Sequence, residues 1–259
     1  MKPVRLTPSL RERVWGRTSL GPWFPDSEKP VGEAWYLADH DLPLLVKLLF
    51  TSDRLSVQVH PDDGEDGPRG KTEMWHILEA HPESAIALGF REPISRERLR
   101  QAAESGEVEH LLNWIPVQAG QTYFTPAHTV HAIGAGIVLV EIQQNSDVTY
   151  RLWDYGRRRE LHLEQALRIA NLDTHPGAVA LPVVSKHFVT EMVEIDAGAS
   201  HRPTSQTCQL WIPLAGQGSI AGEPLRAGEV WLLPEGAEQP AIRANSAMRL
   251  LRSYVPPLQ

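Results

Sequence analysis

Side chains that suit a divalent metal are spread over the first half of the chain. Gln58 and His60 stand two residues apart, Glu73 follows after a turn-rich stretch, and His131 comes at long range. Imidazole nitrogens and a carboxylate oxygen are ligands that zinc accepts, usually four at a time. One carboxylate among neutral ligands would leave about one positive charge on the site, so the metal would stay a useful Lewis acid. We therefore predict one zinc ion per chain, held by Gln58, His60, Glu73 and His131.

The spacing of these residues indicates extended strands. Side chains on a strand alternate between its two faces, so Ser56, Gln58 and His60 share one face and the apolar residues between them share the other. Lys71 and Glu73 have the same parity in the next extended run. We expect both runs to line one cavity. The alternative is that Gln58 and His60 face solvent on a half-buried sheet.

Turn residues and short apolar runs divide the chain into many short strands with few helices. Ser95 is a suitable N-cap for a helical segment near 95–112, and Gly106 divides that segment into what we expect to be two short helices. A second helical pattern covers 163–172, with apolar residues at helical spacing. Short strands at close spacing favour β-barrel or jelly-roll units.

Size and composition narrow the class of protein. The 259 residues suffice for one large all-β unit or two smaller domains, and the net charge of −7 without a basic stripe argues against a nucleic-acid partner. No window approaches the ~18 apolar residues of a membrane span, and the N-terminal residues lack a signal-peptide pattern. Cys208 is the only cysteine, so no intrachain disulfide is possible. We expect a cytoplasmic monomer or homodimer that binds neither nucleic acid nor a membrane.

Two segments share the frame G-x5-P-x4, followed by His131 in 120–131 and by Gln239 in 228–239. The frame resembles the second motif of the cupins, in which a strand runs into a turn that presents a metal-binding histidine. His128 stands where that motif has a glycine free to adopt positive φ, which makes His128 a rival ligand, although a surface loop position fits it better.

We therefore predict a mainly β protein of two cupin-type jelly-roll barrels with a small helical insertion. Residues 1–175 would form the metal-binding catalytic domain. Residues 176–259 would form a degenerate cupin domain without metal, because the position of the ligand histidine holds glutamine.

A series of segments in fixed order is more specific than any one motif. It resembles the type I mannose-6-phosphate isomerases, in particular their short bacterial form, over about residues 12–170. The segments are LSVQVHPDD at 55–63, GKTEMW at 70–75, PAHTVHAIG at 126–134, EIQQ at 141–144, SDVTYRLWD at 146–154 and RELH at 159–162. The resemblance implies zinc held by the four residues above, a catalytic Arg151, an active-site Lys71, and the interconversion of mannose 6-phosphate and fructose 6-phosphate.

Such an isomerisation moves a proton between C1 and C2 through an enediol, and the residues can be matched to its needs. Arg151 supplies a permanent cation beside the developing negative charge. Lys71 can bind a sugar oxygen, or act as a base if the metal lowers its pKa. Asp147 is the second candidate for proton transfer. Glu141 is a further one, and we place it among the substrate-binding residues.

The phosphate of such a substrate needs its own anchor. Ser56 shares the cavity face with Gln58, and Arg157 follows Arg151 by one short loop, so we expect Ser56 and Arg157 to bind phosphate. The run 157–159 also fits a solvated basic turn, which is the favoured interpretation for its last two residues. Trp35, Trp75 and Trp153 receive no role, because tryptophans are more often core residues.

Two other functions fit the cupin pattern less well. A cupin oxygenase would prefer iron and a site dominated by histidine. A sugar-phosphate-binding cupin without catalysis would not need to keep Lys71, Arg151 and four metal ligands. The sequence thus favours a zinc-dependent isomerase acting on a phosphorylated hexose.

Overall fold

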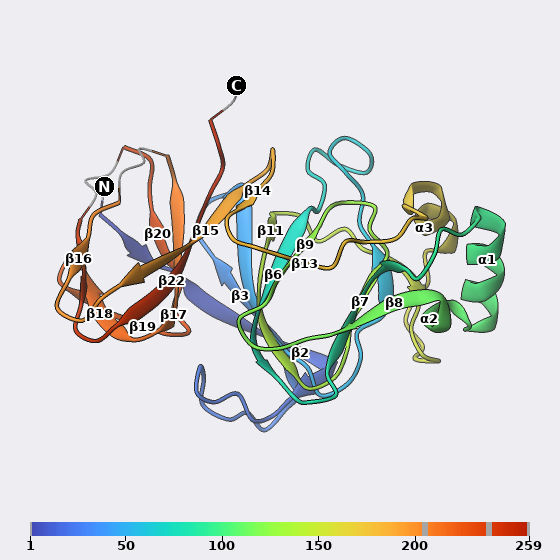
Figure 1. Cartoon of the computed structure of the whole chain (residues 1–259), viewed down its shortest axis with the longest axis horizontal. Helices are drawn as coiled ribbons and strands as arrows, with labels where there is room; N and C mark the ends of the chain where they lie inside the picture. Colours follow the sequence, from blue (N-terminus) through green and yellow to red (C-terminus); the bar gives the residue numbers. More distant parts are fainter. Residues whose placement is uncertain (1, 204–206, 237–239, 258–259) are drawn as a thin grey trace.

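Short apolar runs separated by turns form four antiparallel sheets in the computed structural model, which describes residues 2–203, 207–236 and 240–257. Two of these sheets build a first barrel, and the other two build a second barrel beside it (Figure 1). The expected mainly β, cupin-type fold is confirmed.

The first barrel contains a seven-stranded and a five-stranded sheet. The larger sheet has, in spatial order, β13 (Ala178–Val179), β9 (Thr122–Thr125), β6 (Glu73–Ala80), β11 (Ile137–Gln144), β4 (Leu44–Phe50), β3 (Val31–Leu37) and β2 (Thr7–Arg17). The smaller sheet has β12 (Tyr150–Trp153), β5 (Val57–Val59), β10 (His131–Ile133), β7 (Ala85–Phe90) and β8 (Leu112–Pro116).

The second barrel contains a six-stranded and a four-stranded sheet. The six strands are β1 (Val4–Arg5), β20 (Trp231–Leu233), β17 (Gln209–Ala215), β22 (Met248–Tyr254), β15 (Val189–Ile195) and β14 (Val183–Val184). The four strands are β16 (Ser200–His201), β21 (Ile242–Ala244), β18 (Gln217–Ile220) and β19 (Glu223–Arg226).

Three helices lie at the end of the first barrel that is remote from the second (Figure 1). They are α1 (Arg96–Ser105), α2 (Val108–Leu111) and α3 (Leu163–Ile169). The predicted division of the early helical segment is confirmed: the Ser95 hydroxyl accepts from the Arg98 amide at 3.1 Å, and Gly106 ends α1 in the left-handed region at φ 85°. Among the described residues, no helix has the length and apolar character needed to cross a bilayer.

Alternation along the strands determines which faces are buried. Val57, Val59 and Ala132 on the outer face of the five-stranded sheet pack against the helices. The outer face of the seven-stranded sheet packs instead against the second barrel, in one apolar cluster that includes Phe50 and Leu210. The interior of the first barrel holds a third apolar cluster, which includes Trp75 and Leu139, and the polar side chains of Glu73 and Glu141 lie on the same inner faces of their strands.

The two barrels also exchange strands. β1 pairs with β20 in the second barrel, and β13 pairs with β9 in the first. The division into 1–175 and 176–259 stays a prediction, and both exchanged strands cross it. The interior of the second barrel holds an apolar cluster that includes Trp211, Trp231 and Leu250, together with the buried Arg252, whose Nε donates to Oε1 of Gln209 at 2.9 Å.

Candidate metal and substrate site

Strand pairing in the first barrel brings the predicted ligands together. On β5, Gln58 stands opposite His131 of β10 on one side and Arg151 of β12 on the other. Directly opposed residues of antiparallel strands share a face, so these three side chains point into the barrel. Glu73 begins β6 in the facing sheet. The parity predicted for Gln58 thus corresponds to an interior position.

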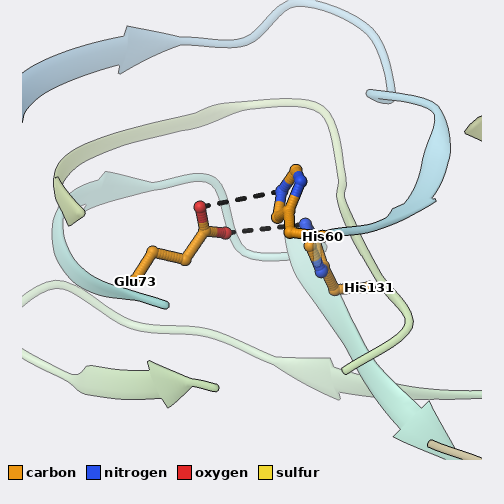
Figure 2. Close-up of side chains that lie close together, drawn as sticks. All are labelled: His60, Glu73 and His131. Atoms are coloured by element: carbon orange, nitrogen blue, oxygen red, sulfur yellow. Dashed lines mark ion pairs between the residues drawn. The ribbon is translucent and has the colours of Figure 1, made fainter. Parts of the chain in front are cut away.

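His60, Glu73 and His131 form a compact buried group. Their ligand atoms all lie within 4.8 Å of one another. The carboxylate of Glu73 points at both imidazoles, with Oε2 3.8 Å from Nε2 of His60 and Oε1 3.5 Å from Nε2 of His131 (Figure 2). Each side chain is 2% exposed or less. The group can therefore hold a metal ion.

Both histidines are prepared to act as ligands through Nε2. Nδ1 of His60 lies 2.9 Å from the Val148 carbonyl, and Nδ1 of His131 lies 2.8 Å from the Thr129 carbonyl. These carbonyls fix the proton on Nδ1 and leave the Nε2 lone pair free. Burial, with Lys71 as the next cause, lowers the pKa of His60 well below its usual value and that of His131 to about 4. The imidazoles are thus neutral, as metal ligands must be.

A buried oxygen without a partner marks the same position. Oε1 of Glu73 makes no hydrogen bond in the described structure, although almost no solvent reaches it. Such atoms are uncommon because desolvation without compensation is costly. Burial raises the pKa of Glu73 to about 7, against the opposing effect of Lys71. A cation bound between Glu73 and the two histidines would compensate this carboxylate.

Gln58 lies beside this group. Its Nε2 is 3.2 Å from Nε2 of His131, and its Oε1 accepts from the Ser56 hydroxyl at 3.2 Å. A half-turn of the amide would exchange its oxygen and nitrogen, bringing Oε1 to the metal group while Ser56 accepts from the NH₂. Gln58 as fourth ligand stays a prediction.

Lys71 connects the metal group to the cavity. Its Nζ is 2.9 Å from Nε2 of His60 and 2.5 Å from Oε2 of Glu73, and the side chain is buried. Burial alone would lower the pKa of Lys71, but Glu73 and Glu141 outweigh it and the pKa is raised. The ammonium group therefore partly neutralises Glu73.

A cavity of about 250 Å³ extends from this group toward the surface. It is at the small end of the usual range for ligand sites, which suits a compact ligand. It is lined by the predicted Ser56, Gln58, Lys71, Glu141, Asp147 and Arg151, of which Asp147 is exposed. A larger hollow of about 770 Å³ lies elsewhere on this barrel. Among the described residues, none of the predicted site residues lines it.

The cavity wall also contains a buried ion pair that we did not predict. Nζ of Lys47 lies 2.9 Å from Oε1 of Glu141 and 4.5 Å from the centre of the Trp35 ring. The Trp75 indole donates to the other oxygen of Glu141 at 3.2 Å. Burial opposes ionisation of Glu141, but Lys47 and Lys71 outweigh it and lower its pKa to about 2. A lone lysine in the apolar run 44–50 was the signal available in the sequence.

The arginines near the cavity differ in placement from the expectation. Arg151 lines the cavity, and its Nε is buried without a hydrogen bond among the described residues. Arg159 also lines it, held by two hydrogen bonds to the Asp154 carboxylate at 2.7 and 2.6 Å. Among the described residues that line the cavity, Arg157 does not occur. Its guanidinium pairs instead with Asp154 at 2.9 Å and with Asp53 at 3.6 Å. Arg159 was thus overlooked as a site residue.

His128 and Gln239 were the two uncertain positions of the cupin frames. His128 adopts φ 71°, the conformation usual for the glycine it replaces, and its Nε2 lies 2.7 Å from Oε2 of Glu65. It is therefore a loop residue outside the buried metal group, as the favoured interpretation had it. Gln239 lies outside the described residues.

Two jelly-roll barrels, a buried His–Glu–His group in one of them and a polar cavity with Lys71 and Arg151 define a cupin-type enzyme with a place for a metal. No protein-family model matches the chain. Individual proteins do match it. A mannose-6-phosphate isomerase of Streptococcus mutans is 38% identical over 216 residues, covering 74% of this chain and 68% of that protein.

A mannose-6-phosphate isomerase of Bacillus subtilis is 30% identical, with 91% of this chain and 94% of the relative covered. The crystal structure of the mannose 6-phosphate isomerase from Bacillus subtilis superposes with a TM-score of 0.85 at 26% identity, over 98% of this chain and 100% of that one. The chain therefore belongs to the mannose-6-phosphate isomerase family. The resemblance found in the sequence and the expectation of an isomerase are confirmed.

Proposed function

We propose that this protein is a zinc-dependent isomerase that interconverts D-mannose 6-phosphate and D-fructose 6-phosphate. One observation carries the proposal: Lys71 contacts both His60 and Glu73 of the metal group and lines the same cavity as Arg151. The names of the two relatives above support the choice of substrate.

The chemistry of the metal group fits zinc. Two neutral imidazole nitrogens and one carboxylate, with Gln58 beside them, resemble catalytic zinc sites in ligand type and number. The orphaned oxygen of Glu73 is an independent sign that a cation belongs there. Zinc bound by these residues would supply a fixed positive charge and a Lewis acid for sugar oxygens.

In the proposed reaction, the C2–H bond of the open-chain aldose breaks. Its electron pair forms the C1–C2 double bond of an enediolate, and O1 takes the negative charge. Arg151 stabilises that charge, because a guanidinium already fixed in the cavity need not reorganise during the step. Proton transfer from O2 to O1 and return of a proton at C1 complete the ketose.

Lys71 is the group that we assign to the transfer between C2 and C1. To take this proton Lys71 has to be neutral. A cation bound at the metal group would favour the neutral form, because it would offset the charge of Glu73, which together with Glu141 outweighs burial and raises the pKa of Lys71. The side chain is buried beside the cavity, where the proton is protected from solvent. Asp147, the second candidate, is exposed at the rim and is better placed to exchange protons with water. Glu141, fixed by Lys47, is proposed to bind a sugar hydroxyl through its carboxylate.

The phosphate end of the substrate is assigned to the rim. Ser56 and Arg159 line the cavity with Arg151, and the guanidinium of Arg159 supplies a permanent positive charge for the phosphate while Arg151 serves the enediolate. Arg159 takes the place in this proposal that the sequence gave to Arg157, because Arg159 is among the residues that line the cavity and Arg157 is not.

A coupled assay that detects fructose 6-phosphate from mannose 6-phosphate, with and without chelator, tests the proposal. The metal-replete protein should turn over, and Lys71→Met should lower kcat by about 10²- to 10⁴-fold, the usual contribution of a general acid–base. Asp147→Asn should stay within about tenfold, as expected for a group outside the C1–C2 transfer. Binding without turnover would instead identify a sugar-phosphate-binding cupin.

The remaining expectations stay predictions that rest on the sequence. They are a cytoplasmic location, a monomeric or homodimeric state, and the absence of nucleic-acid and membrane partners. The second barrel is proposed to hold no metal, and the guanidinium of Arg252 among its inner side chains, beside the apolar cluster, supports this.

A further inference from the structure

Two segments that carry His60, Glu73 and Lys71 are held side by side at one end of their strands. The amide of Gly70, in segment 70–73, donates to Oδ1 of Asp63, in segment 60–63, at 2.8 Å. A Cβ on Gly70 would lie 2.5 Å from the carbonyl carbon of Asp62. The backbones are thus in direct contact, and a shift of either segment moves the other.

The same oxygen of Asp63 extends this connection to a third strand. It also accepts from Nε2 of Gln144 at 2.8 Å, and Oε1 of Gln144 accepts from the amide of Thr72 at 2.9 Å. Gln144 ends β11, the strand that carries Glu141. Asp63 therefore fixes three segments whose side chains line the site.

The second barrel contacts this point through the turn between β14 and β15. Nε2 of His187 lies 3.7 Å from Asp62 and Nδ1 lies 3.6 Å from Asp63, so the ring sits between the two carboxylates. The ring is 9% exposed. Nζ of Lys186 lies 3.4 Å from Oδ2 of Asp62. Phe188, next in the chain, is fully buried in the apolar cluster shared by the barrels.

We propose that His187 of the second barrel is a positioning residue for the metal group of the first barrel. It holds the Asp62–Asp63 turn, and through Asp63 the segments of His60 and Glu73. The second barrel then acts on the active site through a turn on its surface. This inference rests on the proposed metal site, because the ligand segments matter only if they bind the ion.

The protein itself supplies the positive charge that two adjacent carboxylates require. Asp62, Asp63 and His187 are also close enough together to hold a cation. Lys186 already provides an ammonium group there, and the oxygen of Asp63 that holds Gly70 and Gln144 is not the one that faces His187. A role in positioning accounts for the contacts of Asp63 with Gly70, Gln144 and His187. A second metal ion would not account for the contacts with Gly70 and Gln144.

Metal affinity is the readout that separates positioning from general stability. The full-length protein is stripped with chelator, and the Kd for zinc is measured by competition with a chromophoric chelator for the wild type and for His187→Ala. Val184→Ala is the matched control, since Val184 is exposed on the same hairpin. Melting temperature, kcat and KM are recorded for each protein, and His187→Gln serves if the alanine variant does not fold.

We expect His187→Ala to weaken zinc binding about tenfold, the lower end of what partners of metal ligands contribute, and to lower kcat while KM changes less than twofold. Val184→Ala should match the wild type. Combining His187→Ala with Asp63→Ala should bind zinc no more weakly than Asp63→Ala alone, because His187 is proposed to act on the ligand segments through the contacts of Asp63 with Gly70 and Gln144.

Three results would overturn the inference. His187→Ala could match Val184→Ala in zinc affinity, the double variant could be additive, or the wild type could bind a second zinc that the variant loses. Failure of the wild type to bind zinc at all would refute the proposed function instead, so the two failures are distinguishable.

Discussion

Removal of the Lys47 ammonium should destabilise the protein strongly, and the size of the effect follows from the cavity wall. The side chains of Lys47 and Glu141 are 4% and 5% exposed, so water cannot replace the lost partner. Burial raises the pKa of Glu141, but Lys47, the largest of the opposing causes, and Lys71 outweigh it and lower the pKa to about 2, so removal of Lys47 leaves this carboxylate without its main partner. Breaking a buried pair from one side typically costs about 3–5 kcal/mol. We expect Lys47→Met to lose about 3 kcal/mol at pH 7.5.

The deficit should depend on pH with a definite sign. The pKa of Glu141 is depressed in the folded protein, so the pair contributes fully above pH 4.5 and progressively less as pH falls toward 2. Without Lys47, burial raises that pKa and the buried carboxyl takes up a proton more readily. The difference from wild type should therefore be smaller at pH 4.5 than at pH 7.5.

Urea unfolding followed by tryptophan fluorescence, at both pH values and constant metal content, measures this difference. The matched control is the double variant Lys47→Met with Glu141→Gln, which removes both charges and keeps an acceptor for the Trp75 indole. It should recover most of the loss. If Lys47→Met loses less than about 1 kcal/mol of unfolding free energy, or loses the same amount at both pH values, Glu141 is not left as a buried unpaired charge, which would cost more.

Four further substitutions test the rim and the two loops beside the metal group. Arg159→Ala should raise the KM for mannose 6-phosphate about 10- to 100-fold, as loss of a charged hydrogen bond does, whereas Arg157→Ala should change it less than about twofold; equal effects in steady-state kinetics would contradict the assignment. Gly70→Ala should cost about 1–3 kcal/mol in urea unfolding, because its Cβ would overlap the backbone of Asp62; a neutral result would show that the segments are not in tight contact. His128→Gly should leave zinc content unchanged and alter stability by about 1 kcal/mol or less, since relief of the φ 71° conformation offsets an exposed ion pair; loss of zinc would make His128 a ligand.

Local patterns in the sequence predicted local features well. Alternation placed Ser56, Gln58 and His60 on the cavity side, because side chains on a strand alternate whatever it pairs with. Ser95 and Gly106 marked the ends of α1, because a cap depends on only a few neighbouring residues.

The parts that depend on strand order were harder to foresee. Arg159 and Lys47 reach one cavity only because β4 and β12 lie in facing sheets, and no local pattern specifies that arrangement. The pairing of β1 with β20 joins segments more than 220 residues apart, with no signal in either. Contacts such as that of His187 with Asp63 arise from the docking of the barrels and cannot be read from spacing.

Whether the metal group is needed for catalysis is tested most directly by a zinc titration of chelator-stripped protein. Bound zinc and turnover of mannose 6-phosphate are measured in the same samples. We expect no turnover without metal, a linear rise of turnover with bound zinc, and saturation at one zinc per chain. The Glu73→Gln variant should fail to bind the ion. Full turnover by metal-free protein, or by the Glu73→Gln variant without zinc, would contradict this expectation.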